Sequence, residues 1–290
     1  MNQGGGVTFQ SITPCLKNNN QCTRIPSSNH PYLFVKMGPP ASGKGSKTVM
    51  NLMDRLAHRS TMLNFSLDSI VELDKNFKKI SRNIAQRSLK NGKIELTPNN
   101  AKRMSTLYYK IRREQTRTNN SRNKTNILAR SAATGHKHMV FETTGKGGET
   151  SLNWIKQYNL NGYKKVLIFP ILPFETLYSR YQSRALKQLQ NPTEAVRIFS
   201  TKNQLKREYN DSLSSFRDIL NKRRNMFNNV YITTNKSNDF KRIYFGETPI
   251  IKVRKNNNTS TSTTTTKLMN RENVIRQLVK YMKSQGVRNQ

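Results

Sequence analysis

The stretch that decides the fold reads Gly38-Pro39-Pro40-Ala41-Ser42-Gly43-Lys44-Gly45-Ser46. It follows a short apolar run, residues 32–37, and precedes a segment with helical spacing of apolar residues, 49–56. A strand, a glycine loop and a helix in this order form the context in which the pattern G-x-x-x-x-G-K cradles phosphate. Backbone N–H groups of such a loop turn toward an anion, and the helix N-terminus adds positive potential. The alternative is a glycine-rich turn that binds no ligand.

This Walker A pattern predicts a nucleotide site. We expect Lys44 to reach the β- and γ-phosphates of ATP or GTP. The cofactor-binding residues predicted from the loop are Gly38, Ala41, Ser42, Gly43, Lys44, Gly45 and Ser46.

Apolar and polar runs divide the 290-residue chain into a core and extensions. Residues 1–29 are polar and read as a disordered leader, and 256–266 are an Asn/Ser/Thr linker before a basic helix at 267–290. Between them, residues 30–255 alternate strands and helices, with a basic helical insert at about 75–130. The alternation predicts an α/β fold with a doubly wound parallel sheet of the P-loop kinase type.

The charge balance is strongly basic, with 51 Lys and Arg against 16 acids and a net charge of +35. Such a field attracts polyanions, above all nucleic acid. An AT-rich coding sequence, as in some viral or protist genomes, also enriches Lys and Asn. From Lys102 to Arg130 there are nine basic residues and one acid, with Tyr108 and Tyr109 among them. That segment is either a single-strand binding surface or a solvated helical face.

Other features of the sequence limit the class of protein. Its two cysteines, Cys15 and Cys22, lack partners at zinc spacing and predict no metal site. No apolar run reaches 18 residues, so we expect no transmembrane helix, and the leader lacks a signal-peptide core. These features favour an intracellular, cytoplasmic or virion-associated protein with no membrane partner.

Two acids are expected beside the loop. Residues 61–68 alternate as a strand that ends at Asp68, and residues 137–142 form a strand that runs into Glu142-Thr143-Thr144. Parallel sheets bind ligands at the carboxyl ends of their strands, so both acids would join the loop there. Asp68 would take or orient the proton of an attacking hydroxyl, and Glu142 would hold magnesium through water or bind substrate. The alternatives are a helix N-cap for Asp68 and a surface acid for Glu142.

Arginines complete the predicted site. Arg180 and Arg184 lie four residues apart on a helix expected at 173–190, hence on one face, and Arg197 follows the turn at 191–192. Guanidinium groups stabilise the charge of phosphoryl-transfer transition states. Each of these arginines could instead be a solvent residue.

The motif order over about residues 30–235 resembles the zeta-toxin group of P-loop kinases. The resemblance implies that Lys44 is the phosphate-loop lysine, Asp68 the catalytic base and Glu142 the acid after the later strand. It places Arg184 and Arg197 at the positions of nucleotide-clamping arginines. The group phosphorylates a sugar hydroxyl of UDP-N-acetylglucosamine with ATP or GTP and Mg²⁺.

Two departures from that group affect what can be expected. Gly45 stands where a hydroxyl usually follows the loop lysine, so Ser46 is the candidate magnesium ligand, as in adenylate-kinase-like loops. The residues after Asp68 also lack the group's acid- and arginine-rich segment, and the basic charge favours an acceptor other than a small nucleotide sugar.

We therefore expect a kinase that transfers a γ-phosphate to a hydroxyl of an unidentified acceptor. The alternatives are a polynucleotide kinase and a non-enzymatic, basic nucleic-acid-binding protein that keeps a P-loop fold. A nucleoside monophosphate kinase fits the loop but not the long insert.

Overall fold

An eight-stranded sheet, in the order β1-β3-β6-β2-β7-β8-β9-β10, organises the molecule. The structure, a computed structural model, describes residues 10–12, 25–66, 68–117, 123–146, 148–222, 226–233, 240–244, 267–284 and 286. Five parallel strands form the centre of the sheet: β3 (Met62–Asn64), β6 (His138–Thr143), β2 (Tyr32–Met37), β7 (Lys164–Pro170) and β8 (Asn229–Thr233). The predicted doubly wound parallel sheet is confirmed.

The order in which strands are added to the sheet reverses at the central strand β2. β3 and β6 lie on one side of it, and β7 and β8 lie on the other. Such a switch point leaves a crevice at the carboxyl ends of the strands, where ligands bind in α/β sheets. The loop at 38–46 follows β2 and therefore lies at this crevice.

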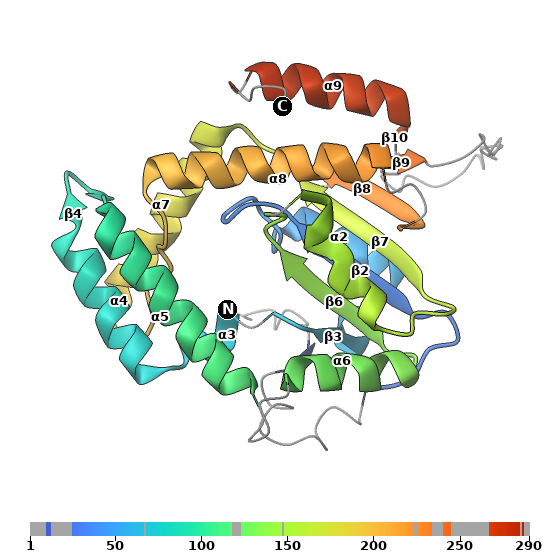
Figure 1. Cartoon of the computed structure of the whole chain (residues 1–290), viewed down its shortest axis with the longest axis horizontal. Coiled ribbons are helices and arrows are strands. Elements are labelled where there is room, and N and C mark those ends of the chain that lie inside the picture. Colours follow the sequence, from blue (N-terminus) through green and yellow to red (C-terminus); the bar gives the residue numbers. More distant parts are fainter. Residues whose placement is uncertain are drawn as a thin grey trace, which may run out of the picture.

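Both faces of the sheet are covered, which explains the near-continuous apolar strands. Helix α2 (Lys47–Leu56) packs Val49, Leu52 and Met53 against one face. The opposite face is covered by α6 (Lys124–Thr134), the 3₁₀ segment η3 (Gly148–Gln157) and α8 (Lys202–Lys222). Figure 1 shows the long α8 with α9 (Arg271–Ser284) lying alongside it.

The sequence predicts the insert at about 75–130, but its last residues, 124–130, belong to α6. The arm beside the sheet is formed by residues 68–116. It contains α3 (Asp68–Glu72), α4 (Lys75–Arg87), the hairpin β4 (Leu89–Lys90) and β5 (Lys93–Ile94), and α5 (Pro98–Thr116). Of these, α4, α5 and β4 lie at the left of Figure 1. Asp74 caps α4 by accepting from Phe77 N at 2.8 Å, and Thr97 caps α5 with Pro98 in its first turn. These caps separate the insert into distinct helices.

Helix α7 (Phe174–Gln190) fastens the arm to the sheet. Gln182 accepts from Ile94 N at 2.9 Å and donates to Ile94 O at 3.1 Å. Arg82 of α4 donates to four carbonyls at the end of α7 and beyond it, those of Gln188, Leu189, Asn191 and Glu194, at 2.6–3.1 Å. Ser81 accepts from Val196 N at 3.2 Å. The arm and the segment after α7 are therefore one packed unit.

Three predictions from the sequence are corrected. The strand expected at 61–68 ends at Asn64, because Asn64 Oδ1 accepts from Ser66 N at 3.1 Å and turns the chain out of the sheet. Asp68 is consequently the first residue of α3 rather than the end of a strand. Within the leader, expected to lack structure, β1 (Gln10–Ser11) pairs with β3 and Ile25 is buried.

The chain beyond β8 is partly described. β9 (Phe240–Tyr244) and β10 (Lys267–Asn270) extend the sheet, and the expected C-terminal helix is α9. Tyr281 of α9 hydrogen-bonds Tyr209 of α8 at 2.7 Å, so α9 packs back on the core. Cys15, Cys22 and the linker at 256–266 lie outside the described residues. No helix in the described ranges is long and apolar enough to cross a membrane.

Candidate active site

A cavity of about 1040 Å³ lies at the carboxyl end of the sheet, between the strand ends and the arm. The predicted site residues that line it are Ala41, Ser42, Gly43, Lys44, Gly45, Asp68, Glu142, Arg180, Arg184 and Arg197. Gly38 and Ser46 lie at the two ends of the loop and are not among the lining residues. Its volume reaches the upper end of the range for small-molecule sites, about 300–1,000 Å³.

Backbone geometry fixes the loop in an open turn. Gly38 N donates to Thr143 O at 3.0 Å, so the loop begins against the end of β6. Ala41 and Gly43 have φ of +61° and +93°, the left-handed region that costs an alanine on the order of 1 kcal/mol. A Cβ on Gly38 would lie 2.7 Å from Ser42 Oγ, so this glycine allows a close approach of the chain. Strain of this kind is typical of ligand-binding turns.

Lys44 lies across its own loop. Its Nζ donates to Gly38 O at 2.6 Å and to Pro39 O at 3.0 Å. Burial lowers the pKa of Lys44 to about 8, against the opposing influence of Glu142 and Asp68. A half-buried ammonium with a lowered pKa gains from a polyanion placed beside it, because the anion favours the charged form.

The end of the loop forms the start of α2. Ser46 is the N-cap, and its Oγ accepts from Val49 N at a long 3.4 Å. Gly45 is exposed, has no left-handed φ, and a Cβ there would meet nothing within 4 Å. Position 45 therefore has room for a side chain, and no packing or backbone requirement explains its glycine.

Asp68 is held as a carboxylate by two partners. Tyr108 of α5 donates its hydroxyl to Oδ1, and Arg197 pairs with Oδ2. Burial alone would raise the pKa of Asp68, but Arg197, the Tyr108 hydrogen bond and Lys44 together hold it below its usual value. Burial and the neighbouring carboxylate raise the pKa of Tyr108, so this phenol stays a donor.

Arg197 connects two acids of α3. Besides Asp68, it pairs with Glu72 through Nη1 at 2.9 Å. Burial would lower the pKa of Arg197, but Asp68 and Glu72 raise it above its ordinary value. Burial raises the pKa of Glu72, so this carboxyl binds its proton more tightly than a free one. Since the pKa of Asp68 is lowered and that of Glu72 is raised, Asp68 is the more fully ionised of the two partners of Arg197.

Arg184 lies behind Arg197 and keeps donor capacity. Its Nη2 donates to Arg197 O at 3.3 Å, and burial and the nearby Arg197 charge lower its pKa. The Nε atoms of Arg184 and Arg197 are both buried and have no hydrogen-bond partner within the described residues. Buried unpaired donors are rare in proteins, and two guanidinium donors of this kind in one cavity suit an anionic ligand.

Glu142 has a partner that the sequence did not suggest. Lys36 of β2 pairs with it at 2.5 Å, and the two residues are adjacent in the parallel register of β2 and β6. The Lys36 side chain is only 2% exposed, whereas that of Glu142 is 26% exposed toward the cavity. The signal in the sequence was a lysine inside an otherwise apolar strand, residues 32–37.

The turn after β6 adds one more ion pair. Gly145 has φ of +76°, and a Cβ there would collide with the Met37 side chain, so the turn after residues 141–144 needs glycine. Lys146 pairs with Glu208 of α8, which also accepts from Ser200 Oγ at 3.1 Å. Thr143, Thr144 and Lys146 of this turn line the cavity.

The oxygen ligands that Ser46 and Glu142 offer suit a magnesium ion that is also held by nucleotide phosphates. Mg²⁺ usually binds one or two protein oxygens, substrate phosphates and water. The described residues contain no cluster of three or more His, Cys, Asp or Glu side chains. Ser46 Oγ retains lone-pair capacity, and Glu142 presents its exposed oxygen from the neighbouring strand. A nucleotide-bound magnesium therefore suits these residues, and a metal held by protein alone does not.

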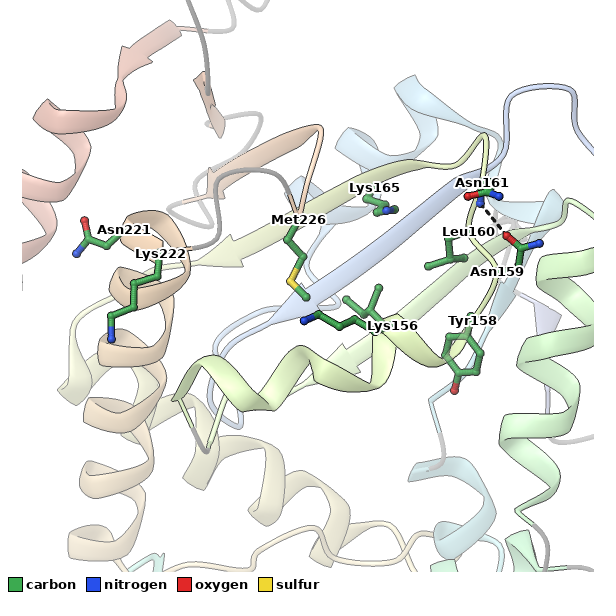
Figure 2. A pocket seen from close by; sticks show the side chains of 10 residues that line it. Lys156, Tyr158, Asn159, Leu160, Asn161, Lys165, Asn221, Lys222 and Met226 are labelled. Carbon is green, nitrogen blue, oxygen red and sulfur yellow. Dashed lines mark hydrogen bonds between the residues drawn. The ribbon is translucent and has the colours of Figure 1, made fainter.

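A second hollow of about 660 Å³ lies at the opposite end of the sheet, beside the start of β7. Figure 2 shows Lys156, Lys165 and Lys222 among amide and apolar side chains there. None of its lining residues carries a carboxylate, imidazole, thiol or aliphatic hydroxyl. It therefore lacks the groups for acid–base or nucleophilic chemistry, and the cavity at the carboxyl end is the candidate active site.

Comparisons with known proteins add little to this geometry. No protein-family model and no curated protein matches the sequence. Among solved structures, the chain is similar to one from the PezAT chromosomal toxin–antitoxin system of the human pathogen Streptococcus pneumoniae. The identity is 13%, the match covers 77% of this chain and 76% of that chain, and the TM-score is 0.48. A likeness at that level decides neither fold nor function.

Proposed function

We propose that this protein is a P-loop kinase that transfers the γ-phosphate of ATP or GTP to a hydroxyl group. The observation that carries the proposal is one cavity lined by Lys44 of the phosphate loop and by Asp68, a carboxylate held between Tyr108 and Arg197. Binding of a nucleotide alone does not need such a carboxylate, but positioning an attacking hydroxyl does. The motif resemblance to the zeta-toxin group supports the same activity.

The donor nucleotide would lie along the loop. Backbone N–H groups of residues 43–45 and the start of α2 would surround its phosphates, and Lys44 would move from the loop carbonyls to the β- and γ-oxygens. Arg184 would place its unpaired Nε donor on the transferring group. Magnesium, when bound, neutralises charge on the β- and γ-phosphates, and Ser46 and Glu142 are the residues that would hold it.

The acceptor hydroxyl would meet the γ-phosphorus at Asp68. Its oxygen forms the new bond to phosphorus, while the bond to the oxygen that bridges the β- and γ-phosphates breaks and the nucleoside diphosphate leaves. Asp68 accepts a hydrogen bond from the hydroxyl and then its proton. Since Arg197 lowers the basicity of Asp68, the carboxylate acts mainly by orientation, which suits a loose transition state that needs little base strength.

The test is a transfer assay with γ-labelled ATP and GTP in the presence of magnesium, run against sugar nucleotides, nucleic acids and proteins. We expect label in one acceptor class with wild-type protein and transfer on the order of 100- to 1000-fold slower with Lys44→Ala or Asp68→Asn. The protein should also bind a fluorescent nucleotide analogue, and Lys44→Ala should bind it more weakly. Wild-type protein that neither binds nor hydrolyses ATP or GTP would contradict the proposal.

A further inference from the structure

The wall of the cavity opposite the phosphate loop is one face of α5. Its lining residues Ser105, Tyr108, Tyr109, Arg112 and Thr116 recur at helical spacing. Tyr108 holds Asp68, and its ring contacts that of Tyr109 edge-on, with centroids 5.4 Å apart. Tyr109 is 56% exposed. An exposed aromatic ring therefore lies directly beside the residue that orients the reacting carboxylate.

Basic residues continue this face outside the cavity. Lys102, Tyr109 and Arg113 lie at i, i+7 and i+11 and are exposed, and Arg112 lies beside them at the cavity rim. The helix carries five basic residues and one acid, Glu114, which is 4.0 Å from Lys110. Lys102 and Arg113 have no ion-pair partner within the described ranges. We call these four residues, Lys102, Tyr109, Arg112 and Arg113, the α5 stripe.

The far end of the cavity suits a flat, polar group. Arg117 at the end of α5 bridges to Asn123, which places the start of α6 next to the stripe. Tyr158 donates to Asn126 Oδ1 at 3.0 Å, so the Asn126 amide nitrogen is directed to donate elsewhere. The half-buried Trp154 ring lies against Phe141 in the same wall, with centroids 4.5 Å apart. Amide donors and aromatic faces are the groups that hold a nucleobase.

We propose that the phosphate acceptor is a terminal sugar hydroxyl of a single-stranded nucleic acid, an inference that rests on the proposed kinase activity. The base of the terminal nucleotide would lie by Trp154 and Asn126, and the sugar hydroxyl of the same nucleotide would meet Asp68. The first phosphates after the terminal nucleotide would lie by Arg112 and Arg113, a following base would stack on Tyr109, and a later phosphate would meet Lys102. The hydroxyl oxygen bonds to the γ-phosphorus, the nucleoside diphosphate leaves, and the proton passes to Asp68 and then to solvent.

The length of the stripe favours a polymer over a small nucleotide. From Lys102 to Arg113 it spans eleven residues of helix, or about 16 Å at 1.5 Å per residue. That is several times the rise of about 3.4 Å per nucleotide in a strand of B-form DNA. Interleaved basic and aromatic side chains are the pattern of proteins that bind single strands without reading their sequence.

The test measures oligonucleotide binding and transfer in the full chain. A single-stranded DNA or RNA with a 5′-hydroxyl and a 3′-fluorophore is titrated by anisotropy, and transfer of label from γ-labelled ATP or GTP is followed. The paired substitutions Lys102→Glu and Arg113→Glu should weaken oligonucleotide binding at least 10-fold. The slope of log affinity against log salt concentration should become shallower by about the contribution of two phosphate contacts. Binding of a fluorescent ATP analogue should stay unchanged, because neither residue lines the cavity.

The matched control reverses two exposed charges on α4, Lys79→Glu with Arg87→Glu, and should leave oligonucleotide affinity within about twofold. Tyr109→Ala should weaken binding on the order of 10-fold at unchanged salt dependence, which separates stacking from charge.

Equal losses in the α5 and α4 double variants would overturn the inference, because the attraction would then be diffuse. Transfer of label to a sugar nucleotide or mononucleotide but to no oligonucleotide would overturn it as well, and would leave the kinase proposal intact. If wild-type protein transfers phosphate to no acceptor and binds no nucleotide, the proposed function fails and the inference fails with it.

Discussion

The two ends of one parallel sheet use the same type of residue in different ways. At the amino end, Lys156, Lys165 and Lys222 surround a hollow that contains no carboxylate. At the carboxyl end, the buried Lys36 pairs with Glu142, and the half-buried Arg197 pairs with both Asp68 and Glu72. A large excess of positive charge attracts polyanions wherever it lies. Only paired and desolvated charges fix the geometry that a reaction needs.

The largest contrast between the two ends should come from their lysines. Lys44→Ala removes the ammonium that would meet the β- and γ-phosphates, and we expect phosphate transfer to fall on the order of 1000-fold. Lys165→Ala at the amino-end hollow should leave transfer and nucleotide affinity within about twofold. Initial rates and equilibrium titrations measure both variants. Comparable losses at the two ends would mean that the phosphate loop is not the site.

Asp68→Asn tests the role of pairing at the carboxyl end. The amide keeps the size of the side chain but cannot accept a proton, so the transfer rate should fall on the order of 100- to 1000-fold. Nucleotide affinity should change by less than about threefold, since Lys44 and the loop are untouched. Stopped-flow single-turnover rates and a nucleotide titration separate the two effects. Full activity of this variant would exclude Asp68 from the reaction.

The Lys36–Glu142 pair gives a prediction about stability. Lys36→Met leaves Glu142 without its cation, and removal of one partner of a buried pair costs about 3–5 kcal/mol. Because the Glu142 side chain is 26% exposed, we expect about 2 kcal/mol in the free energy of unfolding by urea. Adding Glu142→Leu should recover part of the loss. A single variant as stable as wild type would show that the pair has no structural weight.

The lowered pKa of Lys44 predicts that protons are taken up with the nucleotide. In the free protein the pKa of Lys44 is lowered to about 8. A bound triphosphate favours the ammonium form of Lys44 and therefore raises this pKa. Binding at pH 8 should therefore take up about half a proton, and affinity should decline as pH rises above 8. Calorimetry in two buffers of different ionisation enthalpy measures the uptake. Lys44→Ala, if it binds at all, should show none from this group.

The smallest effect is expected at Gly45. A serine there meets no atom within 4 Å and no backbone strain, so the free energy of unfolding should change by less than about 0.5 kcal/mol. The variant restores a hydroxyl directly after Lys44. An unchanged magnesium dependence of transfer would support Ser46 as the hydroxyl ligand. A lower magnesium requirement would show instead that position 45 limits metal binding in the natural chain.

The glycine turn at 38–46 and the sheet were predictable from sequence because both depend on local patterns. The loop needs glycine at fixed spacing, and buried parallel strands such as 165–170 read as apolar runs. Asp68 was correctly expected at the carboxyl end of the sheet, but it begins α3 and does not end a strand. The reason is that the Asn64 side chain ends β3 early. That bond competes with sheet pairing and is not visible in a hydrophobic pattern.

The partners of the site residues could not be read from the sequence. Tyr108 is 40 residues from Asp68, and Arg197 is 129 residues away. Lys36 looked like one polar residue in an apolar strand until the register of β2 and β6 placed it beside Glu142. Contacts of this range depend on how the arm and α7 pack, and a chain with 51 basic residues offers many equal candidates.

Arg82 gives the molecule a mechanical property. By binding four carbonyls at the end of α7 and beyond, its single guanidinium joins the arm to the segment that carries Arg197. A shift of the backbone at Arg197 would therefore be coupled to the arm. If that backbone segment moved, the arm would move with it, and the β4–β5 hairpin at the far end of the arm would be displaced the most. A spin label at Lys90 would therefore report nucleotide binding as a change in its distance from the sheet.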